Sequence, residues 1–276
     1  EASAAASVTM GAITGLALGM GKPGLDLRIA GGLGGVDSAA PSFAMWQISR
    51  IVRNSPALTQ EFDAGIGGLE ARLLAIDDPA FNTAFSSLLD LHGSRGPNEW
   101  ELRSQTWETN PELALALIDR MRLAADDQDP QIRHQKAKER SSTALSELRT
   151  MVSGDETSAG TLEIAVTSSS VFIPARENAK TAIVKVVHEV RLAALELGRR
   201  LAEDGRLEDQ RHIFMLQDKE LEEAIAGNMT KEASDREKQY LQLFDLTPPF
   251  WFNGDLPPAE KWQSTDTNYP ERKIVQ

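Results

Sequence analysis

The sequence predicts a mainly α-helical (all-α) protein, an irregular multi-helix bundle that ends in an extended, proline-rich tail. Apolar residues recur at steps of three and four along most of the chain, which is the period of one helix face, whereas strict alternation is scarce. Cap residues directly precede proline at four places: Ser55-Pro56, Asp78-Pro79, Asn110-Pro111 and Asp129-Pro130. Proline suits the first turn of a helix, so each pair is a start signal. We expect a helical domain over residues 1–246 and an extended tail over residues 247–276.

These signals place the first helices in chain order. Residues 8–21 are apolar and rich in glycine and should form a helix or a buried loop, too short to span a bilayer. Asp37 or Ser38 should cap a helix that ends near Asn54. The four proline signals predict helices over about residues 56–73, 79–92, 111–121 and 130–151.

One long helix over residues 170–206 is expected to organise the chain. Pro174 suits its first turn, and Gly205 suits its end. Residues 161–170 before it remain ambiguous between a strand and a short helix, and later helices should begin at Asp218 and cover residues 231–246. One face of the long helix is predicted to carry two cations and then an apolar stripe: Arg176, Lys180, Ile183, Val187, Val190, Ala194, Leu197 and Leu201.

An anion site is predicted where this stripe begins. Because Lys and Arg are rarely buried without a partner, the stripe should run from a core into a cleft, with Arg176 and Lys180 at the cleft wall. The free N–H groups and positive dipole end of a helix that starts at Pro174 would favour a phosphoryl group or a carboxylate there. The alternative is an ordinary solvated helix face, in which Glu177 balances the two cations.

Composition excludes several classes of function. The net charge of −12 argues against a general nucleic-acid-binding protein. The chain has no cysteine, which excludes disulfides, a thiolate nucleophile and cysteine-based metal sites. Residues 8–21 lack the basic start of a signal peptide, and no membrane association is expected. A cytoplasmic location is compatible with these features.

Two motifs have simpler interpretations than a functional one. The segment GMGKPG at residues 19–24 has Pro23 where a phosphate loop needs Ser or Thr after Lys22, so a Gly/Pro loop is favoured. The run DDQD at residues 126–129 lacks the spacing of an isoprenoid-type magnesium motif and is interpreted as a helix end and cap. The histidines show no metal-ligand spacing, so no metal site is predicted. His188 lies off the apolar stripe and is expected at the surface.

Residues 91–107, LHGSRGPNEWELRSQTW, are unusually dense in charged and aromatic side chains for a connection between helices. They contain His92, Arg95, Glu99, Arg103 and Trp107. Such a loop is either a buried ion-pair network or a functional loop, and both interpretations remain open.

Three stretches resemble a known family. They are residues 91–115, residues 176–225, which begin RENAK, and residues 236–249, REKQYLQLFDLTPP. They are similar to the central region of the phosphoenolpyruvate-synthase-like and rifampin-phosphotransferase-like enzymes, including phenylphosphate or methylbenzyl phosphate synthase types. The resemblance implies a longer protein with an ATP-grasp domain, which binds ATP and Mg²⁺, and a mobile phospho-histidine domain. Neither pattern occurs here, and His212 does not match that histidine, so this chain alone should bind no cofactor and be inactive.

The resemblance also implies roles for particular residues. Arg176 and Lys180 match the Arg-x-x-x-Lys pair of the family's central helix and should stabilise the transferred phosphoryl group. The acceptor should be a small, aromatic hydroxyl compound. Substrate-binding candidates are Met45, Trp46, His92, Arg95, Glu99, Arg103, Trp107, Phe172 and Glu177. The alternative function is a non-catalytic helical scaffold.

Overall fold

The structure is a computed structural model that describes residues 1–33 and 39–265. It is mainly α-helical, as predicted, and divides into two compact units, Glu1–His188 and Glu189–Gln276. The boundary predicted between residues 246 and 247 lies inside the second unit and stays a prediction.

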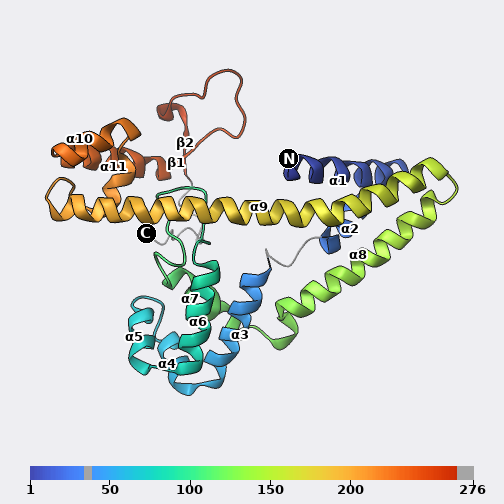
Figure 1. Ribbon diagram of the computed structural model, residues 1–276, viewed down its shortest axis with the longest axis horizontal. Helices are drawn as coiled ribbons and strands as arrows, with labels where there is room; N and C mark the ends of the chain where they lie inside the picture. Colours follow the sequence, from blue (N-terminus) through green and yellow to red (C-terminus); the bar gives the residue numbers. More distant parts are fainter. Residues whose placement is uncertain (34–38, 266–276) are drawn as a thin grey trace. The chain divides into compact units, whose positions relative to one another are not determined.

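The first unit contains α1 (Ala2–Gly19), α2 (Leu25–Leu33), α3 (Ala40–Asn54), α4 (Pro56–Asp63), α5 (Leu69–Ile76), α6 (Pro79–His92), α7 (Glu112–Arg122), η1 (Asp126–Gln128), α8 (Pro130–Val152) and most of α9 (Glu156–Glu203). The end of α9 belongs to the second unit, with η2 (Gln210–Met215), η3 (Asp218–Glu220), α10 (Leu221–Ala226), α11 (Thr230–Gln242), η4 (Leu243–Asp245), β1 (Leu246–Thr247), η5 (Ala259–Lys261) and β2 (Gln263–Ser264). Figure 1 shows α9 as the longest helix.

Helix starts follow the cap-and-proline signals closely. The side chains of Ser55, Asp78 and Asp129 accept hydrogen bonds from backbone N–H groups in the first turns of α4, α6 and α8. These bonds satisfy donors that a helix start would otherwise leave free. The predicted caps Asp37 and Ser38 lie outside the described residues.

The helix predicted over residues 56–73 is instead two helices. Helix α4 ends at Asp63 and α5 begins at Leu69. Gly65 and Gly68 between them have positive φ angles of 103° and 69°, a region that glycine enters without a steric penalty. The apolar period continues across the break, so periodicity alone predicted one helix.

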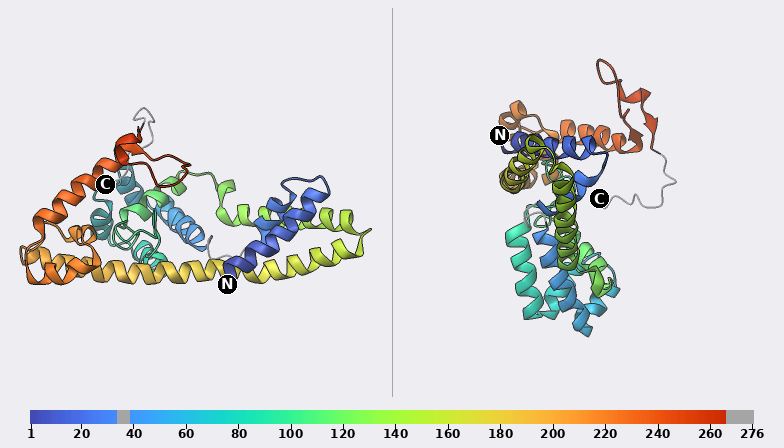
Figure 2. Two further views of the ribbon diagram at one scale, coloured as in Figure 1. Left: turned by 90° about the horizontal axis from the view of Figure 1, so that it is seen from above. Right: turned by 90° about the vertical axis from the view of Figure 1, so that its right-hand side faces the viewer.

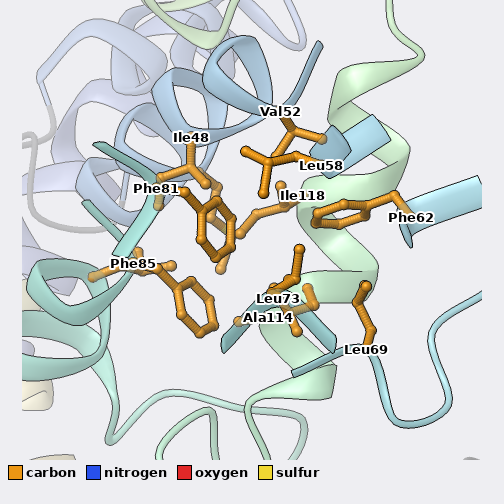
Figure 3. Close-up of a cluster of buried hydrophobic side chains, with 13 residues drawn as sticks. Ile48, Val52, Leu58, Phe62, Leu69, Leu73, Phe81, Phe85, Ala114 and Ile118 are labelled. Atoms are coloured by element: carbon orange, nitrogen blue, oxygen red, sulfur yellow. The ribbon is translucent and has the colours of Figure 1, made fainter. Parts of the chain in front are cut away.

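Helices α3 to α7 enclose the first hydrophobic core of the first unit (Figure 3). The rings of Phe81 and Phe85 stack with centroids 5.4 Å apart, and Phe62 meets Phe81 edge-on at 6.5 Å. The aliphatic residues around them come from all five helices, among them Ile48, Leu58, Leu73, Leu88 and Ile118.

A second core joins α1, α2, α8 and the first turns of α9. Its buried members include Ile13, Ile29, Leu148 and Leu162. Figure 2 shows α2 beside α8. The two helices approach closely because Gly32 faces Ser141, whose hydroxyl donates to the carbonyl of Ile29 at 2.6 Å.

Helix α1 is longer than the sequence suggests. It has 18 residues, so the prediction that this segment is too short to cross a membrane is wrong. Among the described residues it is the one helix long and apolar enough for a span, with a mean hydropathy of 1.4. Ile13 and Ala17 pack into the second core, although only 17% of the helix is buried.

Pro174 does not begin a helix. Helix α9 starts at Glu156, and Pro174 lies in its interior, where it removes one backbone hydrogen bond. The ambiguous residues 161–170 are therefore helical. The predicted end is confirmed: Gly205 has a φ of 70°, and Arg206 N–H donates to the carbonyl of Leu201, a helix-ending pattern.

The apolar stripe predicted on α9 also differs from the observed one. Ile183 and Val190 are 52% and 50% exposed, whereas Val184 and His188 are buried. The buried face is displaced by about one residue from the predicted one. The buried face in this part of α9 carries the polar residues His188 and Arg191 beside Val184, so hydrophobicity alone could not select it. Near the end of α9 the predicted stripe holds, because Leu201 is buried and Ala194 and Leu197 pack against the same core.

The second unit has a small core of its own, formed by Leu201, Leu207, Ile213, Ala224 and Ala233. The carboxylate of Glu220 joins α11 to the preceding turns, because both guanidinium nitrogens of Arg236 bind it at 2.5 and 2.7 Å. Within the described part of the tail, β1 and β2 form a short antiparallel pair.

The contact between α2 and α8 predicts a strong difference between two adjacent glycines. A Cβ at Gly32 would lie 2.3 Å from the Cβ of Ser141, whereas a Cβ at Gly31 meets no atom within 4 Å. Gly32→Ala should lower the free energy of unfolding by about 1–3 kcal/mol through overpacking. Gly31→Ala should be neutral or stabilising by up to about 1 kcal/mol. Urea unfolding of both variants measures this, and equal effects would contradict the close contact.

The Glu220–Arg236 pair predicts a pH dependence. Hydrogen bonding from Arg236 lowers the pKa of the Glu220 carboxyl from 4.5 to about 2. Its contribution to stability should therefore be complete above pH 4.5 and be lost as the pH falls toward 2. Carboxyl-carbon NMR titration should find this low pKa, and Arg236→Gln should return it toward its ordinary value. Lys231→Gln, which removes the same charge from the first turn of α11, should leave it low.

Candidate functional site

The loop after α6 and the middle of α9 form the candidate site, entirely within the first unit. The loop folds back on itself: Trp107 N–H donates to the carbonyl of Arg95 at 2.8 Å, and Glu108 N–H donates to that of Gly93 at 3.0 Å. Gly96 permits a close crossing, since a Cβ there would lie 2.7 Å from the carbonyl oxygen of Gln105. The charged side chains of the loop are thereby held in an ordered segment.

Glu99 connects this loop to α9. Its side chain is only 9% exposed, and its two carboxylate oxygens bind Arg95 Nε at 2.9 Å and Lys180 Nζ at 3.2 Å. The Lys180 side chain remains 40% exposed. A buried carboxylate needs such partners, because desolvation penalises its charge. The three side chains together carry one net positive charge.

His188 forms a second connection, and its predicted surface position is wrong. It is 3% exposed, and its Nε2 lies 2.9 Å from the carboxylate of Glu108. Its Nδ1 lies 3.5 Å from the hydroxyl of the buried Thr106. Lys180 and His188 are two helical turns apart, about 12 Å along the axis. Loop and helix therefore meet at two levels. The sequence does contain a signal for this contact, because Lys180, Val184 and His188 are spaced four residues apart and so share one face of the helix.

Arg176 lies one turn before Lys180 and is exposed. In the described part of the chain no carboxylate forms an ion pair with it. The start of α9, at Glu156, is about 30 Å away at 1.5 Å per residue. Free backbone N–H groups and the helix dipole therefore do not act on Arg176 and Lys180, and that part of the anion-site prediction is wrong.

The other predicted residues occupy different environments. Met45 is 2% exposed in the first core, against which Trp107 packs. Trp46 is 7% exposed, and the guanidinium carbon of Arg50 lies over its ring, 3.9 Å from the ring centroid of Trp46. Phe172 is exposed at the 36% level. The remaining candidates are half-buried: His92, Arg103 and Glu177.

The acidic run DDQD has structural partners. Asp126 binds Arg50 at 2.8 Å and Arg53 at 3.0 Å, and the hydrogen bond from Arg53 lowers the pKa of its carboxyl. Asp129 caps α8, as predicted. Across residues 1–33 and 39–265, no group of three or more acidic or histidine side chains is arranged to hold a metal ion.

Comparison with known proteins agrees with the resemblance seen in the sequence. The family model described as the rifampicin phosphotransferase fourth domain matches residues 2–177. Uncharacterized proteins of Mycobacterium bovis and of two strains of Mycobacterium tuberculosis are each 25% identical to the chain over 188 residues. The match covers 67% of this chain but only 19% of each relative, so the chain spans about a fifth of their length.

The role of Glu99 as a shared partner predicts an asymmetry between variants. Glu99→Gln removes the partner of two cations and should lower the free energy of unfolding by about 1–3 kcal/mol, less than for a fully buried pair because Lys180 is partly exposed. Lys180→Met should cost less, about 0–1 kcal/mol. Asp90→Asn, an exposed acid on α6, is the control. Urea unfolding measures all three, and an equal, small effect of each would contradict a structural role for Glu99.

Proposed function

The chain belongs to the rifampicin phosphotransferase fourth-domain family, and from this premise we propose that it is the acceptor-binding domain of an ATP-dependent phosphotransferase. Lys180 and Arg176 stabilise the phosphoryl group during its transfer to a small hydroxyl compound. The observation that carries the proposal is the environment of Lys180. Glu99 binds its ammonium from the buried side, while 40% of the side chain remains open to a ligand.

This arrangement suits charge stabilisation. A cation already held by the protein loses little freedom when a ligand arrives, and such preorganised charges are a main contribution to phosphoryl transfer. Arg95 shares the Glu99 carboxylate, so that carboxylate does not fully neutralise Lys180. Arg176, one turn away, adds a guanidinium suited to phosphate oxygens.

The remaining chemistry belongs to other domains. An ATP-grasp domain binds ATP and Mg²⁺ and transfers a pyrophosphoryl group to the histidine of a mobile domain. AMP is the leaving group of that step. Water then releases inorganic phosphate, and the acceptor hydroxyl takes the remaining phosphoryl group. The balance is ATP, water and acceptor to AMP, phosphate and acceptor phosphate. In this proposal the acceptor is a small aromatic hydroxyl compound, the location is cytoplasmic, and the chain itself needs neither nucleic acid nor membrane.

The test uses the chain together with its ATP-grasp and phospho-histidine domains, in one protein or as added subunits. Phenols, benzylic alcohols and rifamycins are screened for acceptor-dependent AMP formation. With the best acceptor, Arg176→Ala combined with Lys180→Ala should lower kcat at least about 100-fold, the scale expected for loss of transition-state charge stabilisation.

Lys185→Ala is the matched control, because Lys185 is an exposed cation of the same helix. It should leave kcat nearly unchanged. A double variant that turns over within a factor of two of the unaltered protein would remove Arg176 and Lys180 from the mechanism. Absence of AMP formation with every acceptor would instead favour the scaffold function.

A further inference from the structure

A second positively charged region lies on α8, apart from Lys180. An open surface hollow of about 620 Å³ is lined by five exposed residues, Arg28 of α2 and Lys136, Glu139, Arg140 and Thr143 of α8. We call it the α8 hollow. Both helices belong to the first unit, and their close packing at Gly32 and Ser141 fixes its walls.

Helical spacing brings the lining residues together. Lys136, Arg140 and Thr143 follow one another at steps of four and three, so they share one face of α8. The two cations are one turn apart, about 6 Å along the axis. Arg28 reaches the same hollow from the neighbouring helix. Three cations from two rigid elements therefore converge on one space.

Two of the three cations in the hollow, Lys136 and Arg140, have no acidic partner among the described residues, whereas Arg28 lies 4.0 Å from Glu147. Glu139 is its one acidic lining residue, and its carboxylate accepts a hydrogen bond from Gln135 at 3.0 Å. No carboxylate of the described residues forms an ion pair with Lys136 or Arg140. The chain has 41 acidic residues against 29 Lys and Arg, so this local excess runs against its overall charge.

One turn further along the same face of α8, the positive charges of α2 and of the preceding loop do have an acidic partner. Glu147 lies 2.9 Å from Lys22 and 4.0 Å from Arg28. The hydrogen bond from Lys22 lowers the pKa of the Glu147 carboxyl, as an ion pair should. At Lys136 and Arg140 the equivalent acidic partner is missing from the described chain, and repulsion between like charges would be relieved by an anion.

We propose that the α8 hollow binds a diphosphate group, either as free pyrophosphate or as the diphosphate of a nucleotide. Lysine and arginine are the usual ligands of phosphate oxygens, and the volume suits a small ligand. The lining has no aromatic or large apolar side chain, unlike the centre of most protein interfaces. A diphosphate engages more of the three cations than orthophosphate does. The argument uses neither Lys180 nor the proposed transfer reaction.

The test is isothermal titration of the chain with inorganic pyrophosphate, orthophosphate and ADP at about 0.15 M salt, where exposed long-range attraction is largely screened. Pyrophosphate should bind at a single saturable site, at least about ten times more tightly than orthophosphate. ADP that competes for this site identifies a nucleotide as a source of the group, whereas binding of pyrophosphate alone identifies the free ion.

Variants assign the site. Lys136→Gln combined with Arg140→Gln should weaken pyrophosphate binding at least about tenfold. Lys138→Gln removes a charge from the same helix outside the hollow and should change binding less than twofold. Glu139→Gln should tighten it, because one repulsive charge is lost. Circular dichroism of each variant checks the fold. Equal affinity for pyrophosphate and orthophosphate, no saturable binding, or a correctly folded double variant that binds normally would each overturn the proposal.

Discussion

The carboxylate of Glu99 is the constraint on which the candidate site depends. It is nearly inaccessible to water, and it holds one cation from its own loop and one from the long helix. An ionised carboxylate in such surroundings is tolerated only while its partners remain in place. Loop order and the position of the Lys180 side chain on α9 are therefore linked, and neither changes without exposing a buried charge.

The pair formed by His188 and Glu108 adds a second level to the same contact. A loop joined to a helix at one point could rotate about it, whereas two points about 12 Å apart define its orientation. The backbone bonds that close the loop at Arg95 and Gly93 make the two levels part of one rigid segment. This geometry explains why a connection dense in charge and aromatic residues is ordered. The ion-pair network and the functional loop, two interpretations left open by the sequence, are compatible.

Local rules worked where the interaction is local. Ser55, Asp78 and Asp129 cap helices because their side chains reach N–H groups two or three residues away, a geometry that the sequence itself specifies. Pro174 was also interpreted as a helix start, but no cap residue precedes it, and it lies inside a helix. The approach of Glu99 to Lys180 joins residues far apart in the chain. The sequence singled out each side chain but could not predict the pair, because tertiary packing decides which face of α9 is buried.

Proline within α9 has a mechanical consequence. Because Pro174 has no N–H, the carbonyl of Ser170 receives no hydrogen bond from four residues ahead, and the ladder of the helix is already interrupted there. Bending at that point would break no further backbone bond of this kind. Arg176 and Lys180 both follow Pro174 on an uninterrupted stretch of α9. A bend at the interruption would therefore redirect the preceding turns of the helix, while the guanidinium of Arg176 and the ammonium of Lys180 keep their spacing.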